Sequence, residues 1–190
     1  MVALALSAAV ARNAAVINNL AMTFKVGDRV VHPQHGVGHV VKLENREFEP
    51  GVVRGYYEIS IPGGSTLWAP VDLPTSGLRK LSDRAEIARC RKVLESRPSP
   101  LVADARLRQT DLSDRLKLGT LRSQCEVVRD LYAHGEHKSL YGTIANFFRT
   151  AQTVLCQEWS VVEGITLAEA VDEVNALLEK SRRTVNKSKA

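Results

Sequence analysis

Apolar and polar residues alternate along the chain from Met22 to about residue 72. A period of two is typical of β-strands, because successive side chains of a strand point to opposite faces of the sheet. The segment His32-Pro-Gln-His-Gly36 interrupts the alternation with the Pro and Gly of a tight turn. We expect a charged bend at 45–47, a loop at Pro50-Gly51 and another turn at Pro62-Gly63-Gly64. The expected strands cover about residues 25–31, 37–44, 56–61 and 65–69.

The alternation ends near Leu81, and apolar residues then recur at the three- and four-residue spacing of amphipathic helices. Two capping boxes, each an Asp or Thr followed three residues later by Glu, indicate helix starts at 83 and 166. Gly119 and Gly135 are expected to end helices. The expected helices cover about residues 83–94, 104–118, 121–134, 140–155 and 166–178. The pattern predicts an α+β fold, an N-terminal SH3/Tudor-like small β-barrel followed by a compact five-helix domain.

The chain therefore divides into a barrel domain at 22–80, a helical domain at 81–180 and a basic tail at 181–190 that we expect to be frayed. Residues 1–21 are apolar or small over their first ten positions, but no Lys or Arg precedes that run and Arg12 interrupts it. The run is too short to span a bilayer. Besides Met1, the chain has only Met22, directly before the barrel pattern. We interpret residues 1–21 as a mis-called or disordered extension.

The composition, 44% hydrophobic and 25% charged, is that of an ordinary soluble globular protein. The net charge of +5 is compatible with a polyanionic partner, and most of it lies in the second half of the chain. Cys90, Cys125 and Cys156 lie far apart, and the chain contains no CxxC motif. They are therefore expected to be small core residues in a reducing cytoplasm.

Enzyme signatures are missing from the sequence, which contains neither a P-loop nor a Gly-x-Ser-x-Gly motif. His32, His35 and His39 are close enough in sequence to suggest a metal site. No Cys or carboxylate complements them at ligand spacing, so we interpret them as turn and strand residues. We expect no catalytic activity, no cofactor and no metal.

Four segments carry a resemblance to a known family. They are KVGDRVVHPQHGVG at 25–38, YYEISIPGGSTLWAPVDL at 56–73, Glu126-Val-Val-Arg-Asp-Leu131 and Lys138-Ser-Leu140. In their amino-acid sequences and in their order along the chain they resemble the CarD/CdnL family of bacterial transcription regulators. The first domain is also similar to the RNA-polymerase-interacting module of transcription-repair coupling factors. The resemblance implies a Tudor-like polymerase-interacting domain and a helical domain that contacts DNA.

In that family the first domain docks on the β-subunit lobe of RNA polymerase. The resemblance implies that Arg46, Trp68 and Pro70 bind the polymerase here. Two alternatives remain open. Trp68 either packs in the barrel or lies on the exposed strand that meets the partner. Arg46 is either an interface residue or a solvated loop arginine near Glu44 or Glu47.

The family's second domain inserts an exposed tryptophan into the minor groove at the upstream edge of the transcription bubble. This chain departs there, because no tryptophan lies between residues 69 and 158 and the wedge position falls at or near Ala105. Asp104 and Asp111 each precede an arginine by four residues, so an ordinary surface ion pair is the alternative to DNA contact at these arginines. The candidate DNA-binding residues are Arg106, Arg108, Arg115, Lys117 and Arg122.

The sequence thus predicts a CarD-like transcription regulator that binds the polymerase β-subunit. We expect it to modulate promoter open-complex stability through weak contacts with promoter DNA that are not sequence-specific. The alternatives are a polymerase-binding adaptor whose helical domain recruits a protein, or an SH3-like RNA- or ribosome-binding protein. We expect a cytoplasmic monomer without a membrane partner.

Overall fold

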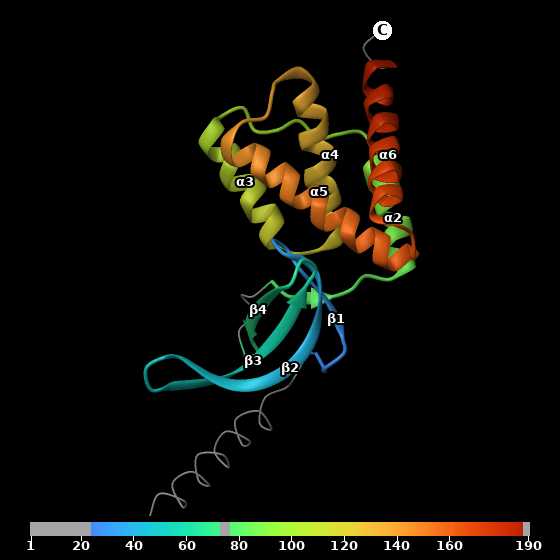
Figure 1. The fold of residues 1–190 in the computed structure, drawn as a ribbon. Coiled ribbons are helices and arrows are strands. Elements are labelled where there is room, and N and C mark those ends of the chain that lie inside the picture. Colours follow the sequence, from blue (N-terminus) through green and yellow to red (C-terminus); the bar gives the residue numbers. More distant parts are fainter. Residues whose placement is uncertain (1–23, 73–76, 188–190) are drawn as a thin grey trace, which may run out of the picture. The chain divides into compact units, whose positions relative to one another are not determined.

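The computed structural model describes residues 24–72 and 77–187 (Figure 1). Its sheet and its helices follow one another along the chain, so the predicted α+β fold class is confirmed. The predicted extension at 1–21 lies outside the described residues. The strands are β1 (Arg29–His32), β2 (Gly36–Glu49), β3 (Val52–Ile61), β4 (Ser65–Pro70) and β5 (Arg79–Lys80). The helices are α2 (Arg84–Glu95), α3 (Ala105–Lys117), α4 (Leu121–His137), α5 (Gly142–Glu163) and α6 (Leu167–Lys187).

The described chain forms two compact units. One contains residues up to Val30 together with Gly38–Lys80, and the other contains Val31–Val37 together with residues from Leu81 onward. The tip of the β1–β2 hairpin is therefore part of the helical unit. There Val31 and Val37 form a buried apolar cluster with Val154 of α5.

The sheet has the strand order β4-β3-β2-β1-β5, and β3 pairs antiparallel with both β2 and β4. One face is apolar and buried, and its side chains include Val40, Tyr57, Ile59 and Ala69. Because side chains alternate along a strand, the residues between these positions point to the opposite face, which is called the outer face below. The two faces account for the period of two in the sequence.

β2 is longer than predicted. The charged bend expected at 45–47 is wrong, because Asn45, Arg46 and Glu47 pair with residues 53–55 of β3. The chain reverses only at Pro50-Gly51, and Figure 1 shows β2 and β3 as one long curved hairpin. This end of the hairpin is largely exposed, so charged side chains are tolerated within the strand. The charges suggested a loop only because a buried strand would exclude them.

Glycine is required at two positions around the first hairpin. Gly36 has φ of +78°, and a Cβ added there would lie 1.7 Å from Oε1 of Gln157. Gly38 allows a close approach to β3, since an added Cβ would lie 2.6 Å from Cγ2 of Ile59. Only a residue without a Cβ fits either site without a shift of its neighbours.

The helical unit is built around Trp159 of α5, which is fully buried. Its indole Nε1 donates to Glu173 at 2.9 Å, and the Arg91 guanidinium lies 5.0 Å from the ring centre. Arg91 also donates to Glu173 at 2.7 Å, so one carboxylate joins α2, α5 and α6. All three cysteines are buried, as expected, and burial raises the pKa of Cys156 to about 11.

Two helix ends differ from the prediction. Gly135 lies inside α4, which continues to His137 and is capped by Lys138. The predicted tail at 181–190 instead continues α6 as far as Lys187. Ser181 is buried there and its hydroxyl donates to the carbonyl of Ser96 at 2.7 Å, so a tertiary contact holds this part of the helix. Among residues 24–72 and 77–187, no helix has the length and apolarity needed to cross a membrane.

Candidate functional site

The outer face of the sheet brings the three sequence-predicted interface residues into neighbouring positions. In the strand register, Glu58 of β3 pairs with Trp68, and Tyr56 pairs with Glu44 on one side and with Pro70 on the other. The outer face consists of Lys42, Glu44, Arg46 and Phe48 from β2, Arg54, Tyr56 and Glu58 from β3, and Trp68 and Pro70 from β4.

Arg46 is the centre of this face. Its guanidinium carbon lies 3.7 Å from the centre of the Trp68 ring, close enough for a cation–π interaction. The same carbon lies 5.9 Å from the centre of the Phe48 ring. Phe48 in turn packs edge-on against Tyr56, with ring centres 4.8 Å apart, and against Trp68 at 6.4 Å. Three aromatic rings and one guanidinium thus form one cluster on exposed strands.

Glu44 sets the charge of the cluster. Its carboxylate accepts hydrogen bonds from the side chains of Lys42 and Arg46. The bond from Lys42 and then that from Arg46 lower the pKa of Glu44, so the carboxylate stays ionised at neutral pH. It fixes the Arg46 guanidinium from one side while Trp68 lies against the other. Arg46 nevertheless keeps 40% of its side-chain surface exposed.

These contacts show where the two residues lie, and their role toward a partner stays a prediction. Trp68 is half-buried against Arg46 and Phe48 on the outer face, and its neighbour Ala69 takes the core position. Arg46 lies in a strand, not in a loop, and it pairs with Glu44 as well. Sequence reasoning missed Phe48, which is 54% exposed. The alternation Glu44, Arg46, Phe48 could have identified it had the strand been extended past residue 44.

The second candidate surface begins at the N-terminus of α3. Asp104 caps the helix by accepting a hydrogen bond from the backbone N–H of Leu107 at 2.8 Å. The predicted wedge position, Ala105, is the first helical residue and is exposed, as is Arg106. Leu107, the next residue along the helix, is 61% exposed. An apolar and a basic side chain therefore project side by side from the start of α3.

A buried ionic network holds the segment that leads into α3. Asp130 of α4 is 1% exposed and lies within the Glu126–Leu131 segment that carries the resemblance. It accepts hydrogen bonds from Arg129 at 2.7 Å, from Arg115 at 2.8 Å and from the backbone N–H of Ser99 at 2.9 Å. Arg129 also donates to Ser96 at 2.6 Å. The loop before α3 and the last turn of α3 are thereby fixed to α4.

The five candidate DNA-binding residues are not gathered into one patch. Arg115 points to Asp130 and also lies 3.7 Å from Asp111, as expected from their spacing. Arg108 donates to the backbone carbonyls of Val102 and Ala103. Arg106 and Lys117, eleven residues apart on α3, line the same surface hollow.

Nearby carboxylates neutralise part of the basic charge. Lys117 pairs with Asp114 at 3.0 Å, and Arg122 of α4 pairs with Glu126 at 3.0 Å. The side chains of Lys117 and Arg122 are nevertheless 72% and 77% exposed, so solvent screens both pairs. Both cations are thus exposed but partly neutralised.

The histidines at the β1–β2 turn have structural roles. His32 accepts a hydrogen bond at Nδ1 from the backbone N–H of Gln34 at 3.1 Å, and its ring lies against that of His35. His39 accepts a hydrogen bond from Arg29 at 3.2 Å. Within the described ranges, no three His, Cys, Asp or Glu side chains are grouped so that they could hold a metal ion.

Comparison with known families covers both parts of the fold. Residues 24–82 match the model of the CarD-like/TRCF RID domain, and residues 89–175 match the model of the CarD C-terminal domain. The chain belongs to the CarD family. Its matched regions include the outer face of the sheet and both α3 and α4, and the two families are of transcription-factor type.

One relative is similar to this chain over nearly the whole of its own length. The Bacillus subtilis (strain 168) protein named "Putative transcription factor YdeB" is 26% identical over 144 residues, which are 75% of this chain and 94% of that protein. Together with the two family matches, this similarity identifies a transcription regulator of the CarD family.

Proposed function

We propose that this CarD family protein binds the RNA polymerase β-subunit through the outer face of its sheet. The observation that carries the proposal is the cluster of Arg46, Phe48 and Trp68 on exposed strands. Tryptophan, tyrosine and arginine are enriched among the residues that dominate the binding energy of protein interfaces. Pairing with Glu44 and Trp68 already fixes the guanidinium, so less entropy is lost on binding. The match to the CarD-like/TRCF RID domain supports polymerase as the partner.

The second half of the proposal concerns DNA. Bound to polymerase, the protein stabilises the open promoter complex through weak, non-sequence-specific contacts of α3. Arg106 and Lys117 supply phosphate contacts, and Leu107 supplies an exposed apolar side chain next to them. Apolar side chains of this kind can wedge between base steps in the minor groove. Arg122 is as exposed as Lys117 and can add to these contacts, whereas Arg108 and Arg115 are held by other groups and contribute less.

The first test is a calorimetric titration of the full chain into the polymerase β-subunit lobe. The double variant Arg46→Glu/Trp68→Ala should bind roughly 30-fold more weakly, the loss expected for two central anchors. The matched control is Lys25→Glu, which makes the same charge change at an exposed position of the same unit. Circular dichroism and the Tm of each variant establish that the fold is retained. Unchanged affinity of a folded double variant would overturn the assignment.

A specific observation also favours a second candidate function, that of an adaptor whose helical unit recruits a protein. Lys117, Arg115 and Arg122 each lie beside a carboxylate, which reduces their attraction for phosphate. Open-complex lifetime on one promoter separates the two functions. Arg106→Ala should shorten the lifetime and Lys92→Ala, an exposed lysine of α2, should not. Equal lifetimes for both variants, with polymerase binding intact, would favour the adaptor.

A further inference from the structure

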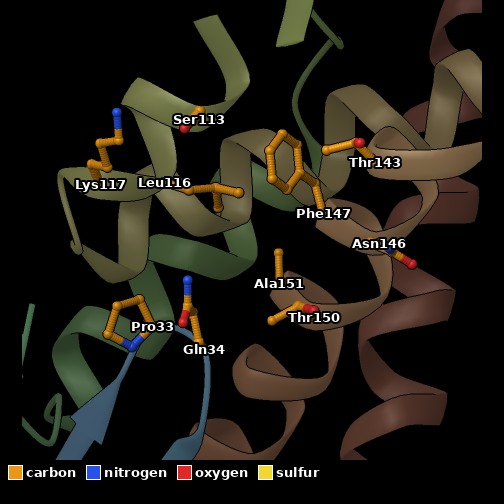
Figure 2. A pocket seen from close by; sticks show the side chains of 10 residues that line it. All are labelled: Pro33, Gln34, Ser113, Leu116, Lys117, Thr143, Asn146, Phe147, Thr150 and Ala151. Atoms are coloured by element: carbon orange, nitrogen blue, oxygen red, sulfur yellow. The ribbon is translucent and has the colours of Figure 1, made fainter. Parts of the chain in front are cut away.

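A groove lies between α3 and α5, and its lining includes Arg106 and Lys117, the two proposed phosphate contacts. Its central cavity has a volume of about 460 Å³, within the range of ligand sites in proteins. Figure 2 shows Leu116, Phe147 and Ala151 pointing toward one another around it, with Ser113 and Thr143 at the edge. The cavity thus has an apolar floor with an aromatic ring and a hydroxyl-bearing rim.

The cavity continues into a second hollow at each end. Toward the start of α3 it shares Ser113, Lys117 and Phe147 with the hollow that contains Arg106. Along α5 it shares Gln34 and Thr150 with a hollow that contains Arg149. The three hollows therefore adjoin one another through shared lining residues, and together they are called the groove.

Charge along the groove favours an anionic occupant. The three hollows contain three cations, which are Arg106, Lys117 and Arg149. One carboxylate opposes them: Asp114 lines the same hollow as Arg106 and pairs with Lys117. Lys117 extends along the edge of the central cavity in Figure 2. Cations at intervals along a groove suit a backbone with regularly spaced negative charges better than a single compact anion.

We infer that this groove binds a single DNA strand, with the phosphates along Arg106, Lys117 and Arg149 and one base in the cavity against Phe147. Stacking of bases on aromatic side chains within a basic groove is the general means of binding single strands without sequence preference. Neutral amide and hydroxyl groups at the rim can pair with the edge of any base. The inference rests on the proposed function, because polymerase supplies an unpaired strand when it opens a promoter.

Fluorescence anisotropy of the full chain tests the inference without polymerase. The probes are a labelled oligothymidylate of about 12 nucleotides and an abasic strand of the same length, since single-strand sites span roughly 4 to 16 nucleotides. Phe147→Leu should weaken binding of the thymidylate at least about fivefold and leave the abasic strand unchanged, because leucine keeps an apolar side chain at this position and has no ring on which a base can stack. Equal binding of both probes by the native chain would overturn the inference.

Two exposed positions provide a test that does not depend on a core residue. Lys117→Ala should weaken both strands about threefold and reduce the slope of log K against log salt by about 0.7. Asp114→Asn should tighten both strands, because it removes the opposing carboxylate, and Lys92→Ala is the charge-matched control for Lys117→Ala. Opposite changes at positions 114 and 117 are expected even if Phe147→Leu fails to fold. If neither variant differs from the control, the inference is wrong.

Competition against the labelled strand tests for two other occupants of the groove. Displacement of the strand by thymidine monophosphate at equal nucleotide concentration would show that the cavity takes a free nucleotide, which would overturn the strand assignment. Equally effective displacement by a duplex would show general phosphate attraction only, with the same consequence. The groove variants should bind the polymerase lobe as the native chain does, so failure of this inference is distinguishable from failure of polymerase docking.

Discussion

The guanidinium of Arg46 lies 3.7 Å from the centre of the Trp68 ring, although the two residues belong to strands that are not neighbours in the sheet. The long side chain of Arg46 reaches across β3 to make this contact. One interaction therefore joins β2 and β4 on the outer face of the sheet. It also holds both side chains in a fixed arrangement before any partner binds.

The first prediction concerns the energy of this contact. A double-mutant cycle of Arg46→Ala and Trp68→Leu should give a coupling free energy of about 0.5 to 1 kcal/mol, the range for a cation–π pair at an exposed site. Urea unfolding of the full chain followed by circular dichroism measures it. Arg54, which pairs with Arg46 in the strand register, provides the control cycle of Arg54→Ala with Trp68→Leu. If the control cycle gives an equally large coupling free energy, the contact between Arg46 and Trp68 contributes nothing specific to stability.

A second prediction separates a buried carboxylate from an exposed one. Asp130→Ala should lower the free energy of unfolding by about 3 to 5 kcal/mol, because it leaves Arg115 and Arg129 without their buried partner. Asp114→Ala removes the exposed partner of Lys117 and should cost at most about 0.5 kcal/mol. Chemical denaturation of both variants provides the measurement. Similar losses would show that the Asp130 network contributes no more than a surface pair.

The two networks also show how far sequence reasoning can reach. The pairing of Arg115 with Asp111 was expected because residues four apart on a helix are neighbours. Its contact with Asp130 was not, because that contact depends on how α3 packs against α4. The pairing of Asp130 with the N–H of Ser99 joins residues 31 positions apart and leaves no local pattern. Local spacing predicts helices and their surface pairs, and packing decides which charges become buried.

The same limit applies to the outer face. The alternation of apolar residues predicted the buried face well, because burial excludes polar side chains there. Exposed strands are under no such restriction, so the charges at 45–47 were interpreted as a bend and Phe48 was missed. Arg46 and Trp68 are predicted as interface residues through a family resemblance, and this prediction concerns a partner about which composition and periodicity say nothing.

A third prediction concerns pH. Burial, and then the charge of His35, lower the pKa of His32 from 6.5 to about 4. Between pH 6.5 and 4, His32 is therefore protonated in the unfolded chain and neutral in the folded chain. The free energy of unfolding is highest above pH 6.5 as far as His32 is concerned, and it falls as the pH drops toward 4. The loss should be about 1 to 2 kcal/mol after allowance for solvent screening.

His32→Asn tests this prediction, because asparagine keeps an acceptor for the N–H of Gln34 and does not titrate. Its free energy of unfolding should vary less between pH 6.5 and 4 than that of the native chain. The control is His39→Asn at an exposed position of β2, which should retain the native pH dependence. If both variants follow the native curve, the loss of stability in acid arises elsewhere.

The last prediction concerns the start of α3, which contains Ala105, the predicted wedge position. Ala105 and Leu107 are both exposed and stand on either side of Arg106. Leu107→Ala should shorten the open-complex lifetime, because it removes the apolar side chain nearest the DNA contact. Ala105→Trp should lengthen it several-fold, since a larger apolar wedge gains more from a distorted duplex.

Leu118, which is 69% exposed at the other end of α3, provides the matched control through Leu118→Ala. A lifetime that responds equally to loss of either leucine would show that α3 contacts DNA without a wedge. A lifetime unchanged by Ala105→Trp would show that the start of the helix does not reach the duplex at all.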